Sequence, residues 1–399
     1  MALLSTIFQA LLRKGALLGV FVLLIIGIVE VALWLFAPVA PHADYEFTFK
    51  NAMTPYGLEE SSRYEIDSRE VRTRPSAEDR SERVKMLILG GEGTAQPLQS
   101  VGDTVWGRVA TEIERQFPHV GLDVSVKASN TSNARGTSLK RALSWAKTYA
   151  PELEPDIMVV SFGISEVLDV PEAFRYNPTT MQTLPALARP SSIKDKIVRV
   201  SQLARRVRLS RKAGSKALAE RKAQWEKQDF FLMSLGQKQR VFRSLPFDAQ
   251  PPRWAPEHDP KLEYLDGIRA LKALAMRLGA EFIVVGEPTL HDADLSFDGI
   301  DRLNRPRWIK RPTIEDPNGV GMRPDPAWVE LELNRFYEAA DDWAAKEGLS
   351  FVNLNQNHVL PKTVANFVDE TMLNQAGSQR VADEVSPAVT SSIKKVLAK

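Results

Sequence analysis

Three short segments of the chain hold the side chains best placed for chemistry. Glu92 lies in the glycine turn Gly90–Thr94, directly after an apolar run. Ser165 follows a second apolar run, Ile157–Phe162, and Asp369 precedes a helical pattern near the C-terminus. Carboxylates and hydroxyls can transfer protons and hold polar ligands. Ligands bind beyond the carboxyl ends of parallel strands, so we expect the three segments to meet in space.

The order, spacing and flanks of these segments resemble the SGNH (GDSL-type) family of esterases and acyltransferases. That family carries Gly-Asp-Ser after the first strand, Gly-x-Asn-Asp after a middle strand, and Asp-x-x-His before the last helix. By this resemblance Glu92 stands at the nucleophile position, Ser165 at that of the oxyanion-binding asparagine, and Met372 at that of the basic histidine. Gly136 falls in the second family block, and Asp369 alone remains of the triad. The resemblance implies the fold of an ester hydrolase without its chemistry.

The carboxylate at position 92 has three interpretations. Glu92 is a water-facing residue of a turn, a recognition group for a cation, or one half of a carboxylate pair with Asp369 that performs acid–base chemistry, as in glycoside cleavage. Ser165 could still donate one hydrogen bond to an oxyanion, and Gly136 could offer its backbone N–H. A weakened oxyanion pocket is therefore compatible with the sequence.

The missing base has two candidate substitutes. Met372 has no basic nitrogen, which removes general-base catalysis at its position. His358 and His291 both follow strands and lie on the side of the expected site, although each is more simply interpreted as an ordinary loop residue. The chain has five histidines without close ligand spacing and no cysteine, so we expect no metal site, no cofactor and no disulfide.

Alternating strand and helix patterns begin at residue 84. Short apolar runs and, at Leu122–Ala128, an alternating pattern predict strands, and amphipathic stretches between them predict helices. We expect an α/β fold: a three-layer α/β/α sandwich with a five-stranded parallel sheet, which the family resemblance makes flavodoxin-like, over residues 84–399. The expected strands are Val84–Leu89, Leu122–Ala128, Ile157–Phe162, Phe282–Val285 and Phe351–Leu354, and the expected helices are Thr104–Phe117, Thr137–Tyr149, 261–279, Pro326–Glu347 and 375–398.

An apolar segment at 15–37 predicts one transmembrane helix. It carries a single charge and is long enough to cross about 30 Å of hydrocarbon. Arg13 and Lys14 precede it, so residues 1–14 should be cytoplasmic and the main domain extracytoplasmic, on the inner membrane. A cleaved signal peptide is the alternative. Glu30, inside the span, either reaches headgroups or water, is protonated, or meets a partner helix.

Two further regions flank or interrupt the predicted sandwich. Residues 38–83 are polar and proline-containing and predict a stalk and entry segment without a core-facing pattern. Residues 171–255 form an insertion, in which 194–227 carries twelve Lys or Arg against three Asp or Glu. This basic amphipathic pattern predicts contact with anionic lipid, a surface polymer or an acidic partner, and otherwise a solvated helix. The contact residues we single out are Arg205, Arg206, Arg208, Arg211 and Lys212.

The sequence supports two functional hypotheses. The first is a membrane-anchored, extracytoplasmic SGNH-like protein that is catalytically inactive and acts as a binding or assembly component, with other membrane proteins among its possible partners. The second is an active or accessory O-acyl esterase or acetyltransferase on cell-surface carbohydrate or lipid esters, as the family resemblance implies. Nucleic acid is not expected as a partner of an extracytoplasmic domain.

Overall fold

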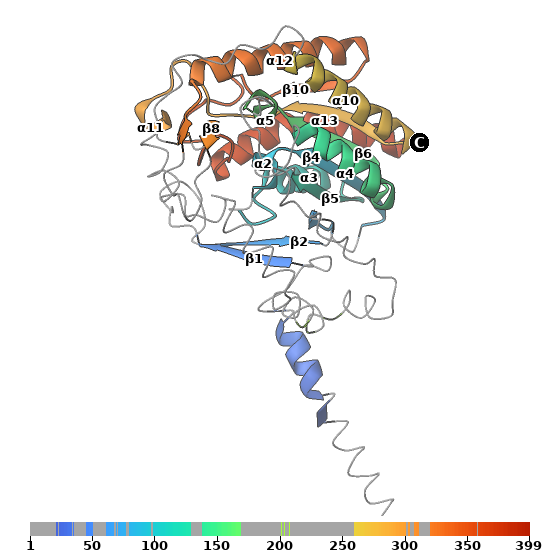
Figure 1. The fold of residues 1–399 in the computed structure, drawn as a ribbon. Helices are drawn as coiled ribbons and strands as arrows, with labels where there is room; N and C mark the ends of the chain where they lie inside the picture. The colour runs from blue at the N-terminus through green and yellow to red at the C-terminus, as the bar shows by residue number, and fades with distance from the viewer. Residues whose placement is uncertain are drawn as a thin grey trace, which may run out of the picture.

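The computed structural model describes an α/β body together with an N-terminal helical stretch (Figure 1). The described residues are 21–35, 45–50, 61–76, 80–128, 138–168, 259–303, 307–310 and 320–399, except 23, 34, 68, 70, 97, 98, 301 and 357, together with 201, 203 and 207. The statements below concern these residues.

The central sheet has six strands in the order β10-β7-β6-β4-β5-β3. The five expected strands are present and pair in parallel: β4 (Glu82–Gly90), β5 (Val120–Ala128), β6 (Ile157–Phe162), β7 (Glu281–Gly286) and β10 (Ser350–Asn353). The prediction of five strands was wrong by one. β3 (Arg72–Arg74) adds an antiparallel edge strand next to β5, within the region expected to be a stalk.

The sixth strand is held by a buried arginine rather than by an apolar pattern. Arg72 is 3% exposed, and its guanidinium donates to the carbonyls of Ala95, Gln96 and Gln99 at 2.9, 2.9 and 2.7 Å. A planar guanidinium can satisfy several acceptors at once. Through Arg72, β3 is hydrogen-bonded to the segment 95–99, which follows the turn at Gly90.

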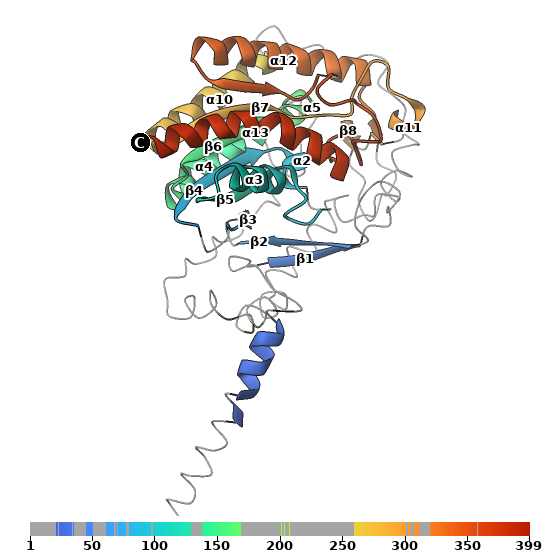
Figure 2. The same cartoon turned by 180° about the vertical axis from the view of Figure 1, so that it is seen from behind.

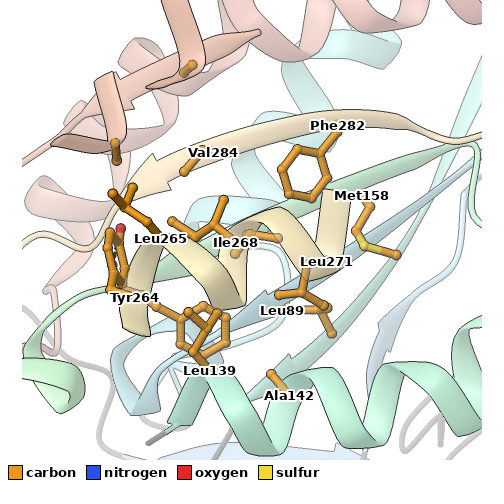
Figure 3. Close-up of a cluster of buried hydrophobic side chains, with 14 of the residues drawn as sticks. Leu89, Leu139, Ala142, Met158, Tyr264, Leu265, Ile268, Leu271, Phe282 and Val284 are labelled. Carbon is orange, nitrogen blue, oxygen red and sulfur yellow. Dashed lines mark hydrogen bonds between the residues drawn. The ribbon is translucent and has the colours of Figure 1, made fainter. Parts of the chain in front are cut away.

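Helices cover both faces of the sheet, which gives the expected three layers (Figures 1 and 2). Along β4, Leu87 and Leu89 pack in one core cluster and Met86 and Ile88 in the other, as side chains alternate along a strand. The first cluster, drawn in Figure 3, joins the sheet to α4 (Ser138–Leu153), α10 (Pro260–Arg277) and α12 (Pro326–Lys346). The second joins it to α3 (Val105–Gln116) and α13 (Gln375–Leu397).

Local sequence sets the ends of these helices. The side chains of Thr104 and Asp325 accept hydrogen bonds from backbone N–H groups of the first turns of α3 and α12, as N-caps do. The chain leaves α10 and α12 through Gly279 (φ 74°) and Gly348 (φ 65°), in the left-handed region that glycine adopts without strain. The predicted helix bounds therefore agree with the structure to within a few residues.

Smaller elements complete the described chain. β1 (Tyr45–Lys50) and β2 (Ser61–Ile66) form a separate antiparallel pair, as do β8 (Arg307–Lys310) and β9 (Val320–Met322). The short helices are α2 (Glu92–Ala95), α5 (Ile164–Leu168) and α11 (Phe297–Ile300).

The two membrane-related predictions fall largely on residues that the structure does not describe. Residues 21, 22, 24–33 and 35 are helical. Within the described part of the chain, no helix has both the length and the apolarity needed to cross a membrane. Arg205, Arg206, Arg208, Arg211 and Lys212 lie outside the described residues, as does most of the insertion.

Candidate functional site

The three predicted segments converge at the carboxyl ends of the central strands. α2 begins directly after β4, α5 directly after β6, and the loop before α13 lies against α2. An added Cβ at Gly93 would lie 2.6 Å from the carbonyl oxygen of Thr371, so the first and third segments are in close contact. The parallel order of β4, β6 and β7 brings these loops to one edge of the sheet.

A carboxylate that the sequence analysis did not single out lies in the middle of this site. Glu287, 2% exposed, follows β7, and its Oε2 accepts a hydrogen bond from the backbone N–H of Ile164 at 3.2 Å. Its Oε1 would lie 2.4 Å from a Cβ added at Gly91. Glu287 therefore connects the turn after β4 with the turn after β6. The available signal was a charged residue directly after a buried strand, in Gly286-Glu287-Pro288.

Asp369 and Met372 belong to a hydrogen-bonded turn before α13. Both are buried, with 6% of each residue exposed. Asp369 Oδ1 accepts from the backbone N–H groups of Thr371 at 3.0 Å and of Met372 at 2.7 Å. The backbone of Val368 in turn donates to the carbonyl of Met372 at 2.7 Å. In this structure the aspartate shapes its own loop.

Further buried polar groups lie behind the site. Ser165, 1% exposed, and Glu166, 3% exposed, are in α5, and Glu166 Oε1 accepts from the N–H of Leu139 at 2.9 Å. The hydroxyl of Tyr337 donates to the carbonyl of Glu287 at 2.9 Å, and that of Tyr264 to the carbonyl of Phe162 at 3.3 Å. Two carboxyl groups and two tyrosines are thus placed together in the interior.

The buried carboxyl groups affect the titration of the two tyrosines. Burial, followed by the negative charges of Glu166 and Glu287, raises the pKa of Tyr264 well above its usual value. The pKa of Tyr337 is also raised well above its usual value, by burial first and then by Tyr264, Glu287 and Glu166. Both phenols therefore stay protonated and serve as hydrogen-bond donors throughout the physiological pH range.

A small cavity of about 30 Å³ lies beside the site. Its polar lining comes from Thr94, Gln96, Ser161, Glu287 and Thr371, and the remaining lining is mostly apolar. A space of this size accommodates water, which needs room of at least about 10–15 Å³. The arrangement can hold ordered water next to a carboxylate, but it is much smaller than pockets that enclose a drug-sized ligand, which are roughly 300 Å³ or more.

The other predicted residues are placed as follows. Glu92 is the first residue of α2, and the structure does not describe its side chain. Gly136 lies outside the described residues. His358 is exposed in a turn after β10, whereas His291, in the loop after β7, is 1% exposed. No group of three or more His, Asp or Glu within the described ranges has the arrangement of a metal site.

Comparisons with known proteins find similarity in structure alone. No family model and no curated protein matches the sequence. The chain is similar to a lipase/acylhydrolase from Enterococcus faecalis (11% identity, 77% of this chain and 96% of the other, TM-score 0.36). It is also similar to a member of the lipolytic G-D-S-L family from Veillonella parvula (8% identity, 77% of this chain and 98% of the other, TM-score 0.34). A third similar structure is a two-domain esterase active on acetylated mannans (12% identity, 80% of this chain and 51% of the other, TM-score 0.33).

Many of the similar structures are thus lipases and acylhydrolases of the SGNH (GDSL) type. At this level of identity the similarity concerns the fold alone. With TM-scores below 0.5, the chemical interpretation rests on the residues of the site described above.

Proposed function

We propose that this chain is a membrane-anchored, extracytoplasmic protein whose SGNH-like domain does not hydrolyse esters by a serine mechanism and acts as a binding or assembly component. The observation that carries the proposal is the position of Glu287. Its carboxylate accepts the N–H of Ile164 and lies against Gly91, between the turns after β4 and β6.

A carboxylate at this place opposes the chemistry of ester cleavage. Attack on an ester carbonyl places negative charge on oxygen, which backbone N–H groups must stabilise. The N–H of Ile164 is already bonded to Glu287. An oxyanion at this place would compete with the carboxyl group of Glu287 for that donor.

The remaining triad positions support the same proposal. Position 372 is a buried methionine, and Asp369 accepts backbone hydrogen bonds of its own loop. A triad aspartate instead orients the histidine that acts as base. Glu92 at the nucleophile position has no hydroxyl to attack an acyl carbon.

The proposed location rests on the N-terminal segment. Residues 15–37 are apolar and follow Arg13 and Lys14, which favours a cytoplasmic N-terminus, an inner-membrane helix and a domain on the outer side. The described helical residues 21–35 expose large apolar side chains, for example Phe21 at 61% and Leu35 at 70%. Partners of the domain would be other membrane proteins, anionic lipid or surface polymer.

An ester-hydrolysis assay tests the proposal. The full chain, purified in mild detergent, should turn over p-nitrophenyl acetate no faster than the heat-denatured sample. Loss of nucleophile and base removes several orders of magnitude from a triad enzyme, so residual catalysis should be invisible. Robust turnover that disappears in Glu287→Gln or His358→Ala would contradict the proposal and show a rebuilt site.

Such a result would favour the second candidate, an active or accessory O-acyl esterase or acetyltransferase on cell-surface carbohydrate or lipid esters. The hydrogen-bonded carboxyl group of Glu287 and the methionine at position 372 argue for inactivity, whereas the fold is of the kind found in esterases and acylhydrolases. A fold alone does not carry an activity. The assay therefore decides between the two.

A further inference from the structure

Three buried residues with hydroxyl groups line the small cavity beside the candidate site. They are Thr94, Ser161 and Thr371, which are 8%, 4% and 4% exposed. Within the part of the chain that the structure describes, none of the three hydroxyls makes a hydrogen bond to another residue. Each hydroxyl offers one donor and two acceptor sites. Because buried polar groups are nearly always hydrogen-bonded, these hydroxyls point to a bound partner inside the cavity.

The register of the sheet brings two of the hydroxyls together. Gly90 of β4 pairs with Ser161 of β6, so these two residues face the same side of the sheet. The hydroxyl of Thr94 occupies the space into which a side chain at Gly90 would project. Neighbouring strands are about 4.8 Å apart, so one water molecule can bridge the hydroxyls of Thr94 and Ser161.

The loop before α13 brings the third hydroxyl to the same cavity. Thr371 lies against α2, because its carbonyl oxygen would be 2.6 Å and its Cβ 3.1 Å from a Cβ added at Gly93. Asp369 accepts the backbone N–H of Thr371 at 3.0 Å, which fixes this part of the loop. The three hydroxyls therefore belong to three separate parts of the site: the turn after β4, the end of β6 and the loop before α13.

The size and the lining of the cavity suit water. Its volume is about 30 Å³. An ordered water needs about 10–15 Å³, so roughly two water molecules fit. Apart from Gln96 and Glu287, the remaining walls are mostly apolar and include Val105, Val285 and Val381. Water both donates and accepts hydrogen bonds, as each hydroxyl does, and a buried water typically makes about three of them.

We propose that about two ordered water molecules occupy this cavity, bridge Thr94, Ser161 and Thr371, and thereby hold the loop before α13 against the turn after β4. The proposal goes beyond the proposed function and does not depend on it. It assigns a ligand to the cavity and gives three side chains a role that is the same whether or not the domain cleaves esters.

Isosteric replacement of threonine by valine distinguishes a hydrated cavity from a dry one. In a dry cavity a buried hydroxyl without a partner costs free energy, so Thr371→Val would raise the midpoint of urea unfolding. In a hydrated cavity the same substitution breaks a water-mediated hydrogen bond and lowers the midpoint. We expect a lower midpoint for Thr94→Val and for Thr371→Val, measured on the full chain in mild detergent. A raised midpoint in either variant would overturn the proposal.

Thr148→Val is the matched control. The hydroxyl of Thr148 is exposed on α4, where it meets solvent in either case, so the midpoint should change little. A decrease in this control as large as in the cavity variants would show that the substitution itself, and not the loss of bound water, lowers the midpoint. The proposal would then fail.

The double variant tests whether the two threonines share the bound water. If the same molecules bridge Thr94 and Thr371, the second substitution should lower the midpoint less than it does alone, because the bridge is already broken. Strictly additive decreases would contradict a shared bridge.

A high-resolution crystal structure of the full chain locates the ligand directly. We expect water in the cavity at hydrogen-bonding distance from the three hydroxyls, roughly 2.6–3.0 Å. An empty cavity would overturn the proposal. So would a metal ion, which would be recognised by contacts to oxygen of about 2.4 Å.

Discussion

The carboxylate of Glu287 occupies the space into which a side chain at position 91 would project. Its Oε1 would be 2.4 Å from a Cβ at Gly91, while its Oε2 accepts the N–H of Ile164 at 3.2 Å. In this position Glu287 leaves no room for a side chain at residue 91. The contact connects the ends of β4, β6 and β7 at the carboxyl edge of the sheet, where ligands bind in open α/β sheets.

Replacing Gly91 by alanine should destabilise the protein. Because the added methyl group meets a buried carboxylate, we expect a loss of about 1–3 kcal/mol in the free energy of unfolding, measured by urea denaturation. Gly91→Ala combined with Glu287→Ala should lose less than the sum of the two single variants. Gly102→Ala is the matched control, since no atom lies within 4 Å of its added Cβ. Additive losses would contradict the mutual dependence.

Arg72 should be one of the most sensitive charged residues. It donates three hydrogen bonds to carbonyls at the end of α2 and in the loop after it, and the single ammonium group of Arg72→Lys cannot reach all three. We expect a loss of about 1.5–3 kcal/mol in unfolding free energy. Arg83→Lys is the control, because Arg83 is half exposed and its ion pair with Asp123 is 3.9 Å long. A smaller effect for Arg72→Lys than for the control would refute this role.

The two buried tyrosines predict a loss of stability at alkaline pH. Their pKa values are raised in the folded state, so the unfolded chain ionises first as pH rises above about 10. Their stabilising effect is complete below pH 10 and declines above it. In a spectrophotometric titration, Tyr264 and Tyr337 should ionise only when the protein unfolds. Tyr337→Phe should reduce the number of such tyrosines by one, and early ionisation of Tyr264 and Tyr337 would disprove the prediction.

Asp369 should act as a structural acceptor. Asp369→Ala leaves the N–H groups of Thr371 and Met372 without this acceptor and should cost about 1–3 kcal/mol, whereas Asp369→Asn keeps an acceptor oxygen and should cost less. Thermal or urea unfolding measures both. Equal losses in the two variants would show that the negative charge, rather than the acceptor, is what the loop requires.

Local sequence determined most of the fold. Local patterns predicted all five parallel strands: a central strand such as β6 is buried at every position and is a nearly continuous apolar run, whereas β5 alternates. Helix signals such as Asp325 before Pro326 and Gly348 after α12 act within a few residues, so they can be recognised without the tertiary structure. The absence of serine at 92 and of histidine at 372 was also visible in the sequence.

Tertiary structure alone decided the sixth strand and the content of the site. β3 has no apolar period, since Arg72 is buried through hydrogen bonds to carbonyls 23 to 27 residues away. Glu287 accepts a hydrogen bond from Ile164, which is 123 residues away in the sequence. Glu30 accepts one from Ser201, which is 171 residues away. A polar side chain becomes buried where distant backbone donors or acceptors satisfy it, and no local pattern records which distant groups those are.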